Sequence, residues 1–157
     1  MSIARPSYLD RYEAAYFQGM RLGEKANPAQ VRVNPAIVVA DDDYYFSMGL
    51  QQELELKGYR AVATEDAEAI EPLIMKYHPE VVVLDHYMRR KTGAQILEEL
   101  INKNLVDESD VILMSGMPTV AEIAEQLGVA FIEKPFESED LMLLVEEATR
   151  VRGLMTV

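Results

Sequence analysis

Short apolar runs alternate along the chain with longer segments of helical spacing, beginning at residue 36. Each run spans four or five consecutive positions, and the strongest runs are rich in β-branched side chains. A strand that is apolar on consecutive positions is buried on both faces, which is typical of a parallel sheet. The three strongest runs are 36–40, 81–84 and 111–114, and two weaker ones are 59–63 and 129–132.

Between these runs, apolar residues recur at spacings of three and four, which predicts helices with one buried face. Pro72 falls inside the second helix, so we expect a kink or a late start there. Pro118 opens the fourth, where proline suits a first turn, and Ser138 caps the fifth. The predicted helices are approximately 46–57, 66–78, 92–102, 118–127 and 138–151.

Five strand–helix units therefore follow one another between residues 36 and 151. Right-handed crossovers arrange such units as an open parallel sheet with helices on both faces. Ligands bind these sheets outside the carboxyl ends of the strands, near the point where the strand order reverses. The polar residues at those ends are therefore the candidates for chemistry.

Polar side chains stand at the ends of four of the predicted strands. The first strand is followed by the run Asp41 to Asp43, the third by Asp85, the fourth by Ser115 and the fifth by Lys134. Carboxylates at one sheet edge repel one another unless a cation is present. Oxygen-only ligands suit a hard divalent ion, and Mg²⁺ binds through a few carboxylates plus a phosphate oxygen. The sequence therefore predicts a magnesium site at this edge.

This combination of side chains indicates phosphoryl transfer. A carboxylate can attack phosphorus to give an aspartyl phosphate. The metal and Lys134 can neutralise oxygens of the transferring group, and Ser115 can hydrogen-bond one of them. Acidic residues at a single strand end are common, so the indication comes from their occurrence together with a hydroxyl and an ammonium group.

Residues 36 to about 151 resemble the receiver domain of bacterial two-component response regulators. The matching motifs are Val-Val-Ala-Asp-Asp-Asp ending at residue 43, Val-Val-Val-Leu-Asp ending at 85, Leu-Met-Ser-Gly ending at 116 and Glu-Lys-Pro-Phe ending at 136. Met88, Gly93 and the turn at 57–59 also fit the family's layout. The resemblance implies a flavodoxin-like, doubly wound sheet of five parallel strands in the order 2-1-3-4-5, with five helices.

The resemblance also implies which residues hold the metal and the phosphoryl group. Asp85 is expected to be phosphorylated. Asp41 and Asp42 are expected to hold Mg²⁺ together with Asp85, and the main-chain carbonyl of Tyr87 is expected to complete the metal shell.

Further roles follow from the same resemblance for the last two strands. Ser115 is expected to move toward the phosphoryl group, and Lys134 to pair with it. Phe131 occupies the position of the family's aromatic switch, without the hydroxyl of the commoner tyrosine. The Lys134–Pro135 peptide bond is expected to be cis.

Three positions depart from the family pattern. Arg89 stands where a proline usually follows Met88, so the loop after Asp85 is expected to be more mobile. Tyr87 and Met117 flank the path of a water that would attack the acyl phosphate, and neither side chain is acidic or an amide. Our hypothesis is that the acyl phosphate hydrolyses slowly without a partner phosphatase.

Several residues near the predicted site have a second interpretation. Asp43 is a third metal ligand or, as we favour, a cap of the first helix. His86 is a general base or, because side chains alternate along a strand, a packing or surface residue that points away from Asp85. The basic residues 89–91 have two interpretations: they attract a phosphodonor or a partner protein, or they simply form a solvated loop. Phe131 is a switch or simply a core residue.

We interpret 1–34 as an N-terminal helical arm and linker, 35–152 as the receiver domain and 153–157 as a C-terminal tail. Ser7 can cap a helix that carries Tyr8, Tyr12 and Tyr16 on one face. An aromatic stripe of this kind needs burial. We favour packing on its own domain or in a homodimer over capture of another partner.

The chain carries a net charge of −12, which argues against nonspecific binding to nucleic acid or to an anionic membrane. Residues 1–34 carry +2 and the remainder −14, so a basic arm precedes an acidic body. No apolar run is long enough to span a bilayer, and the first ten residues lack a signal core, so we expect a cytoplasmic location. The absence of cysteine excludes disulfides and thiol chemistry.

The expected function is that of a phosphoacceptor, and the only chemistry expected is its own phosphorylation and dephosphorylation. The donor would be a histidine kinase or a phosphotransfer protein. Few residues follow the last predicted helix, so the expected output is binding to a downstream protein that the sequence does not identify.

Three other functions were compared with this expectation. A docking module of the same fold would not need phosphorylation, but all the side chains for phosphorylation are present. Phosphatases of the haloacid dehalogenase type place their nucleophile on the first strand and need a later acidic pair, for which only Glu139 and Asp140 at a helix start remain. A flavin-binding domain would need a phosphate-cradling loop after the first strand, and this chain has none there.

Overall fold

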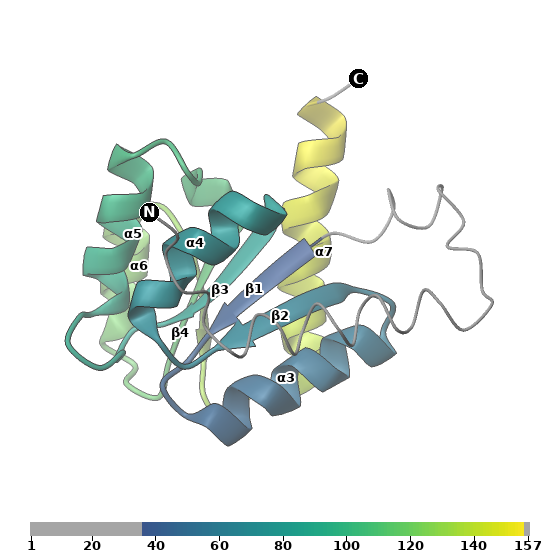
Figure 1. Cartoon of the computed structure of the whole chain (residues 1–157), viewed down its shortest axis with the longest axis horizontal. Coiled ribbons are helices and arrows are strands. Elements are labelled where there is room, and N and C mark those ends of the chain that lie inside the picture. Colours follow the sequence, from purple (N-terminus) through teal and green to yellow (C-terminus); the bar gives the residue numbers. More distant parts are fainter. Residues whose placement is uncertain (1–35, 156–157) are drawn as a thin grey trace, which may run out of the picture. The chain divides into compact units, whose positions relative to one another are not determined.

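The computed structural model describes the backbone of residues 36–155 and the side chains of 36–149. The N-terminal helical arm expected in 1–34 lies outside the described residues. Strands and helices alternate through the rest of the chain (Figure 1). In order, they are β1 (Ala36–Ala40), α3 (Tyr44–Leu56), β2 (Arg60–Thr64), α4 (Ala67–Tyr77), β3 (Val81–Asp85), α5 (Gly93–Asn102), the 3₁₀ turn η1 (Glu108–Asp110), β4 (Val111–Ser115), α6 (Val120–Leu127), β5 (Ala130–Glu133) and α7 (Ser138–Met155).

The five strands form one parallel sheet in the order β2-β1-β3-β4-β5. This confirms the predicted fold class and strand order. The order reverses between β1 and β3, which are neighbours in the sheet although β2 lies between them in sequence. The carboxyl ends of β1 and β3 therefore meet at the position where ligands bind in such sheets.

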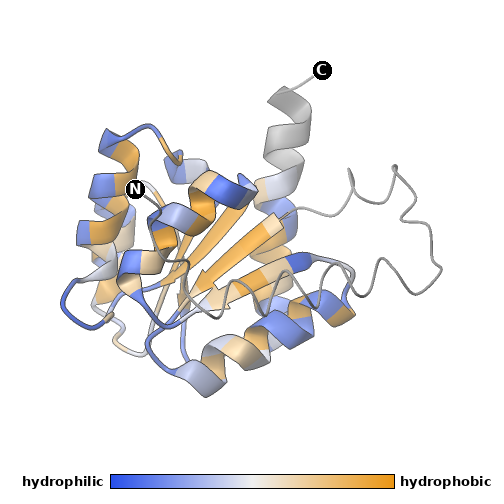
Figure 2. Cartoon of the chain, in the orientation of Figure 1, coloured by the Kyte–Doolittle hydropathy of each residue, from blue (hydrophilic) through white to orange (hydrophobic). Residues whose placement is uncertain are grey.

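Each face of the sheet is covered by helices, and the strands supply side chains to both faces alternately. In β3, Val81 and Val83 belong to one buried cluster, whereas Val82 and Leu84 belong to the other. The first cluster includes side chains of α3 and α7, and the second includes side chains of α4, α5 and α6. Figure 2 shows that the central strands β1 and β3 are mostly hydrophobic, whereas α3, α4 and α5 carry both hydrophobic and hydrophilic residues.

The helix ends follow local capping chemistry. Asp43 caps α3 by accepting the N–H of Phe46 at 3.1 Å, which confirms the favoured interpretation of this residue. Asp66 caps α4, which includes Pro72 in its interior. Thr92 and Gln95 form a reciprocal capping box at the start of α5.

The prediction for the start of α6 was wrong by two residues. Pro118 and Thr119 form a turn, in which the N–H of Ala121 donates to the carbonyl of Pro118 at 3.1 Å, and the helix begins at Val120. The last helix, α7, continues to Met155 and so enters the stretch expected to be a tail. Helix ends depend on such local bonds, which the spacing of apolar residues does not reveal.

Candidate functional site

Three polar residues are buried at the carboxyl edge of the sheet. Asp41 follows β1 directly, Asp85 is the last residue of β3, and Ser115 is the last residue of β4. All three are almost completely inaccessible to solvent, with Asp85 5% exposed. Burial of this kind is rare for unpaired carboxylates, so the partners of these groups decide the character of the site.

Lys134 is the cation that faces the buried carboxylates. Its Nζ donates to Oδ2 of Asp41 and to Oδ1 of Asp85, the latter at 3.1 Å. Its backbone N–H donates to the carbonyl of Ser115 at 2.9 Å, which fixes it beside the end of β4. The Lys134–Pro135 bond is cis, the isomer that the family resemblance implies.

Phe46, in the first turn of α3, also contributes to the site. The ring of Phe46 lies under the Lys134 ammonium, 4.4 Å from Nζ to the ring centroid. Phe136 packs edge-on against the same ring, with 5.9 Å between the ring centroids. Two aromatic rings from α3 and the segment before α7 thus hold the lysine against the carboxylates. The only sequence signal for this was the place of Phe46 in the first turn after β1.

The electrostatics of the site follow from burial and crowding. Burial, and secondarily the charge of Asp41, raises the pKa of Asp85 to about 6. Burial also raises the pKa of Asp41, against the opposing effect of its bond from Lys134. Burial opposes the charge of Lys134 as well, but its bonds to Asp41 and Asp85 outweigh that effect and raise its pKa. The site therefore holds more negative charge than one lysine neutralises.

Asp41, Asp42 and Asp85 fit a divalent cation. Each offers a carboxylate oxygen, and these oxygens lie within 4.8 Å of one another. All the ligand atoms are oxygens, which is the donor chemistry that suits Mg²⁺. Burial raises the pKa values of Asp41 and Asp85, and the charges of neighbouring carboxylates add to this, so a cation here would stabilise the ionised forms. Asp43 does not belong to this group, because its side chain caps α3 and its N–H donates to Asp41 at 2.9 Å.

Local contacts close the loop after Asp85. Tyr87 and Thr92 form an isolated antiparallel bridge that closes it, and Met88 is buried. A Cβ added to Gly93 would lie 2.7 Å from the carbonyl oxygen of Asp85, so only glycine fits beneath the acceptor. His86 is buried with its ring edge-on to that of Tyr87, 4.7 Å between centroids, which agrees with a packing role.

Ser115 and Phe131 are the two residues expected to act as a switch. The hydroxyl oxygen of Ser115 accepts the N–H of Met117 at 3.0 Å. The ring of Phe131, on β5, is partly buried and packs against the cluster formed with α4, α5 and α6. Ser115 is on β4 and Phe131 is on β5, the two neighbouring strands at one end of the sheet.

The fold and this acidic edge are those of a receiver domain, and the comparison with known families agrees. The family described as the response regulator receiver domain matches residues 37–146. The chain belongs to this family. Its members are phosphoacceptor switches of two-component signalling, and phosphorylation and magnesium binding are characteristic of them.

Individual relatives extend this result. The C4-dicarboxylate transport transcriptional regulatory protein DctD of Pseudomonas aeruginosa is 30% identical over 122 residues, covering 76% of this chain and 26% of that protein. The transcriptional regulatory protein PdtaR of Mycobacterium tuberculosis is 27% identical, covering 76% of this chain and 59% of that protein. The chain thus spans only part of the length of these curated relatives.

Solved structures share the fold. The receiver domain of the Francisella response regulator 1452 superposes with a TM-score of 0.67 at 24% identity, covering 75% of this chain and 99% of that one. The structure of FixJ-N superposes with a TM-score of 0.66 at 26% identity, covering 74% of this chain and 94% of that one. Among the described residues, no helix is long and apolar enough to cross a membrane.

Proposed function

We propose that the chain is a phosphoacceptor switch in which Asp85 receives the phosphoryl group. The observation that supports this most strongly is the buried carboxylate of Asp85 at the end of the central strand, in one group of charges with Asp41, Asp42 and Lys134. Structural ion pairs do not require a third carboxylate at the same point. A site in which two carboxylates hold a cation and a third accepts the phosphoryl group uses all three.

In the proposed reaction, one carboxylate oxygen of Asp85 attacks phosphorus and forms a new O–P bond. The bond from phosphorus to the donor breaks, and its electron pair leaves with the donor group. The pKa of about 6 leaves Asp85 mostly ionised at neutral pH, as a nucleophile must be. Mg²⁺, held by Asp41, Asp42, Asp85 and the Tyr87 carbonyl, would supply charge neutralisation at the phosphoryl oxygens.

Lys134 and Ser115 stabilise the phosphorylated state in this proposal. Lys134 Nζ already contacts Oδ1 of Asp85, so a short shift brings it to a phosphoryl oxygen. The Ser115 hydroxyl accepts a hydrogen bond from Met117, and among the described contacts it donates none. Its hydrogen is therefore available to a phosphoryl oxygen.

We propose that Ser115 moves toward the phosphoryl group, and that this movement is coupled to Phe131 and to the surface formed by α6, β5 and α7. Phosphorylation adds charge at the sheet edge and biases a two-state element, here the half-buried ring of Phe131. The donor would be a histidine kinase or a phosphotransfer protein. The receptor of the signal would be a downstream protein that binds the altered surface.

The experiment that tests this function is phosphorylation by acetyl phosphate with Mg²⁺, followed by intact-protein mass spectrometry. The wild type should gain the mass of one phosphoryl group, and Asp85→Asn should gain none. Asp43→Asn is the matched control, because it makes the same substitution in the residue that follows Asp41 and Asp42. The Asp43 side chain caps α3 and does not belong to the proposed metal site, so this variant should still be phosphorylated. An unmodified wild type, also silent toward beryllofluoride, would favour the phosphorylation-independent docking module instead.

A further inference from the structure

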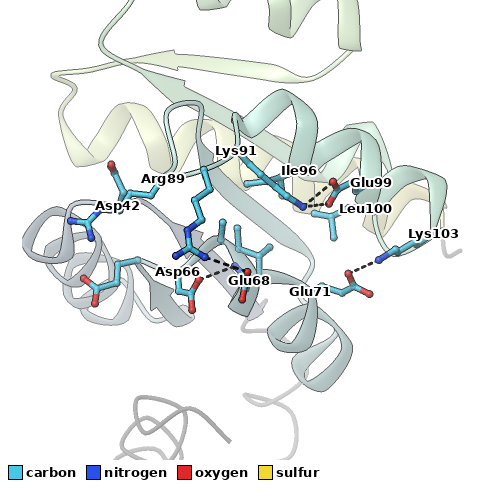
Figure 3. A pocket seen from close by; sticks show the side chains of 14 residues that line it. Asp42, Asp66, Glu68, Glu71, Arg89, Lys91, Ile96, Glu99, Leu100 and Lys103 are labelled. Carbon is cyan, nitrogen blue, oxygen red and sulfur yellow. Dashed lines mark hydrogen bonds and ion pairs between the residues drawn. The ribbon is translucent and has the colours of Figure 1, made fainter. Parts of the chain in front are cut away.

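A cavity of about 650 Å³ lies between α4, α5 and the loop that follows β3 (Figure 3). Its floor includes Ile70, Ile96 and Leu100, and its rim is charged. Asp42 lines the same cavity, so this groove is continuous with the proposed metal site. Figure 3 shows Asp42 and Arg89 at one end of the groove and the pair of Lys103 with Glu71 at the other.

Three of the four cationic side chains that line the groove are directed to acidic partners. Lys91 Nζ contacts both carboxylate oxygens of Glu99 at 2.9 Å. Lys103 Nζ contacts Glu71 at 2.8 Å, and Arg90 lies 3.8 Å from Glu68. These contacts join α4, α5 and the loop across the groove.

Arg89 is the fourth cation, and it has no ion pair or hydrogen bond within the part of the chain that the structure describes. Its side chain is exposed at the Asp42 end of the groove. The backbone that carries it lies between Met88, whose side chain is buried, and Arg90, whose φ of 73° is in the left-handed region. The bridge from Tyr87 to Thr92 closes the same loop. The loop therefore presents a free guanidinium beside a metal ligand.

A phosphodonor meets an electrostatic obstacle at this edge. Its phosphoryl oxygens are negative, and they must approach three carboxylates whose oxygens lie within 4.8 Å of one another. Lys134 cannot meet the donor outside the site, because its ammonium is already bonded to Asp41 and Asp85. A second cation on the open side would offset the repulsion, and the planar fork of arginine matches two phosphoryl oxygens.

We propose that Arg89 binds the phosphoryl oxygens of the incoming donor at the Asp42 end of the groove, before transfer to Asp85. This inference rests on the proposed function. Arg89 forms no covalent bond in the reaction. With acetyl phosphate, the P–O bond breaks and acetate leaves with the electron pair. With phosphoimidazole, which represents phosphohistidine, the P–N bond breaks, and the ring leaves with the electron pair as imidazolate and takes a proton from water to become imidazole.

The test compares initial phosphorylation rates of the wild type, Arg89→Gln, Arg89→Lys and Arg90→Gln at saturating Mg²⁺, with both donors. Arg90→Gln is the matched control, since it removes the same charge one residue away from a side chain directed to Glu68. We expect Arg89→Gln to lower the second-order rate constant about threefold to tenfold with either donor. Arg89→Lys should recover part of the loss, and Arg90→Gln should match the wild type.

Other results would overturn the inference. Equal decreases of the phosphorylation rate constant in Arg89→Gln and Arg90→Gln would indicate that the positive charge of the loop as a whole attracts the donor, and not Arg89 in particular. A loss with acetyl phosphate alone would show that Arg89 recognises the leaving carboxylate instead. Mg²⁺ affinity, followed by tyrosine fluorescence, should not weaken in Arg89→Gln, and a weaker affinity would assign the slow rate to a damaged metal site. A wild type that accepts from neither donor would contradict the proposed function itself.

Discussion

The carboxyl edge of the sheet and the groove beside it contain the same kinds of charged residue in two different environments. At the edge, the Lys134 side chain is 22% exposed, and the side chains of its partners Asp41 and Asp85 are 1% and 7% exposed. In the groove, the Lys103–Glu71 pair is 54% and 38% exposed, and the Arg90–Glu68 pair 86% and 79%. Water therefore screens the ion pairs of the groove strongly and those of the buried edge only weakly.

The difference shows that burial, and not the number of ion pairs, decides where charge affects chemistry. Burial, with the neighbouring negative charges as a lesser cause, raises the pKa values of Asp41 and Asp85, so both carboxylates gain from a bound cation. The exposed pairs contribute little to stability and are available for contacts with a ligand. The following predictions test this contrast.

The largest expected effect is on stability when the buried lysine is removed. In EDTA at pH 7.5, Lys134→Met should lower the free energy of unfolding by about 3 kcal/mol, because two buried carboxylates lose their counterion. Lys103→Met, in the exposed pair, should leave stability essentially unchanged. Urea unfolding followed by circular dichroism measures both, and equal effects in the two variants would contradict the contrast.

The next effect concerns the packing under the proposed acceptor. Gly93→Ala places a Cβ against the backbone of Asp85 and His86, so it should destabilise the protein by about 2 kcal/mol. Gly49→Ala meets open space within α3 and should stabilise by about 0.5–1 kcal/mol. Thermal unfolding measures both variants, and melting temperatures that shift in the same direction in Gly93→Ala and Gly49→Ala would contradict this prediction.

Asp85 should make the stability of the metal-free protein depend on pH. Its pKa of about 6 lies above its ordinary value of 3.8, so the folded state holds the proton more tightly than the unfolded state does. This contribution is fully present below pH 4 and is lost as the pH rises through 6. Asp85→Asn should therefore be more stable than wild type at pH 7.5 by about 2 kcal/mol, with the advantage vanishing near pH 4. An advantage that does not change with pH would contradict this assignment.

The smallest effect concerns the lifetime of the phosphorylated protein. Tyr87 and Met117 are 50% and 51% exposed, so they stand at the surface where water enters and offer it no carboxylate or amide. Replacing both by asparagine should speed the decay about tenfold, below the usual contribution of a positioned proton-transfer group. Tyr45→Asn, an exposed aromatic on α3, is the control and should decay like the wild type. Unchanged decay in the double variant would refute the hypothesis of slow hydrolysis.

Much of the fold followed from the sequence because its strands are buried on both faces. The runs at 81–84 and 111–114 lie within β3 and β4, each of which extends by one residue to include Asp85 or Ser115. Parallel strands place their ends on one edge, so the grouping of Asp41, Asp42 and Asp85 could also be predicted. Local hydrogen bonds decided what the pattern could not, such as the start of α6 after Pro118.

The remaining features of the site depend on tertiary contacts. Phe46 lies under Lys134 because α3 and the segment after β5 meet at the edge, and no spacing in the sequence links these residues. Arg89 differs from Arg90 and Lys91 only in having no partner among the described residues, since Glu68 and Glu99 come from separate helices. The sequence showed residues 89–91 as three equivalent basic residues, and within the described part of the chain only Arg89 of the three has no acidic partner.

The most direct test of the central claim is to locate the phosphoryl group by chemical trapping. After phosphorylation by acetyl phosphate with Mg²⁺, borohydride reduction converts an aspartyl phosphate to homoserine, and peptide mass spectrometry identifies the converted residue. We expect homoserine at position 85 in the wild type and no conversion in Asp85→Asn. Conversion at Asp41 or Asp42, or no conversion of a protein with an intact magnesium site, would contradict it.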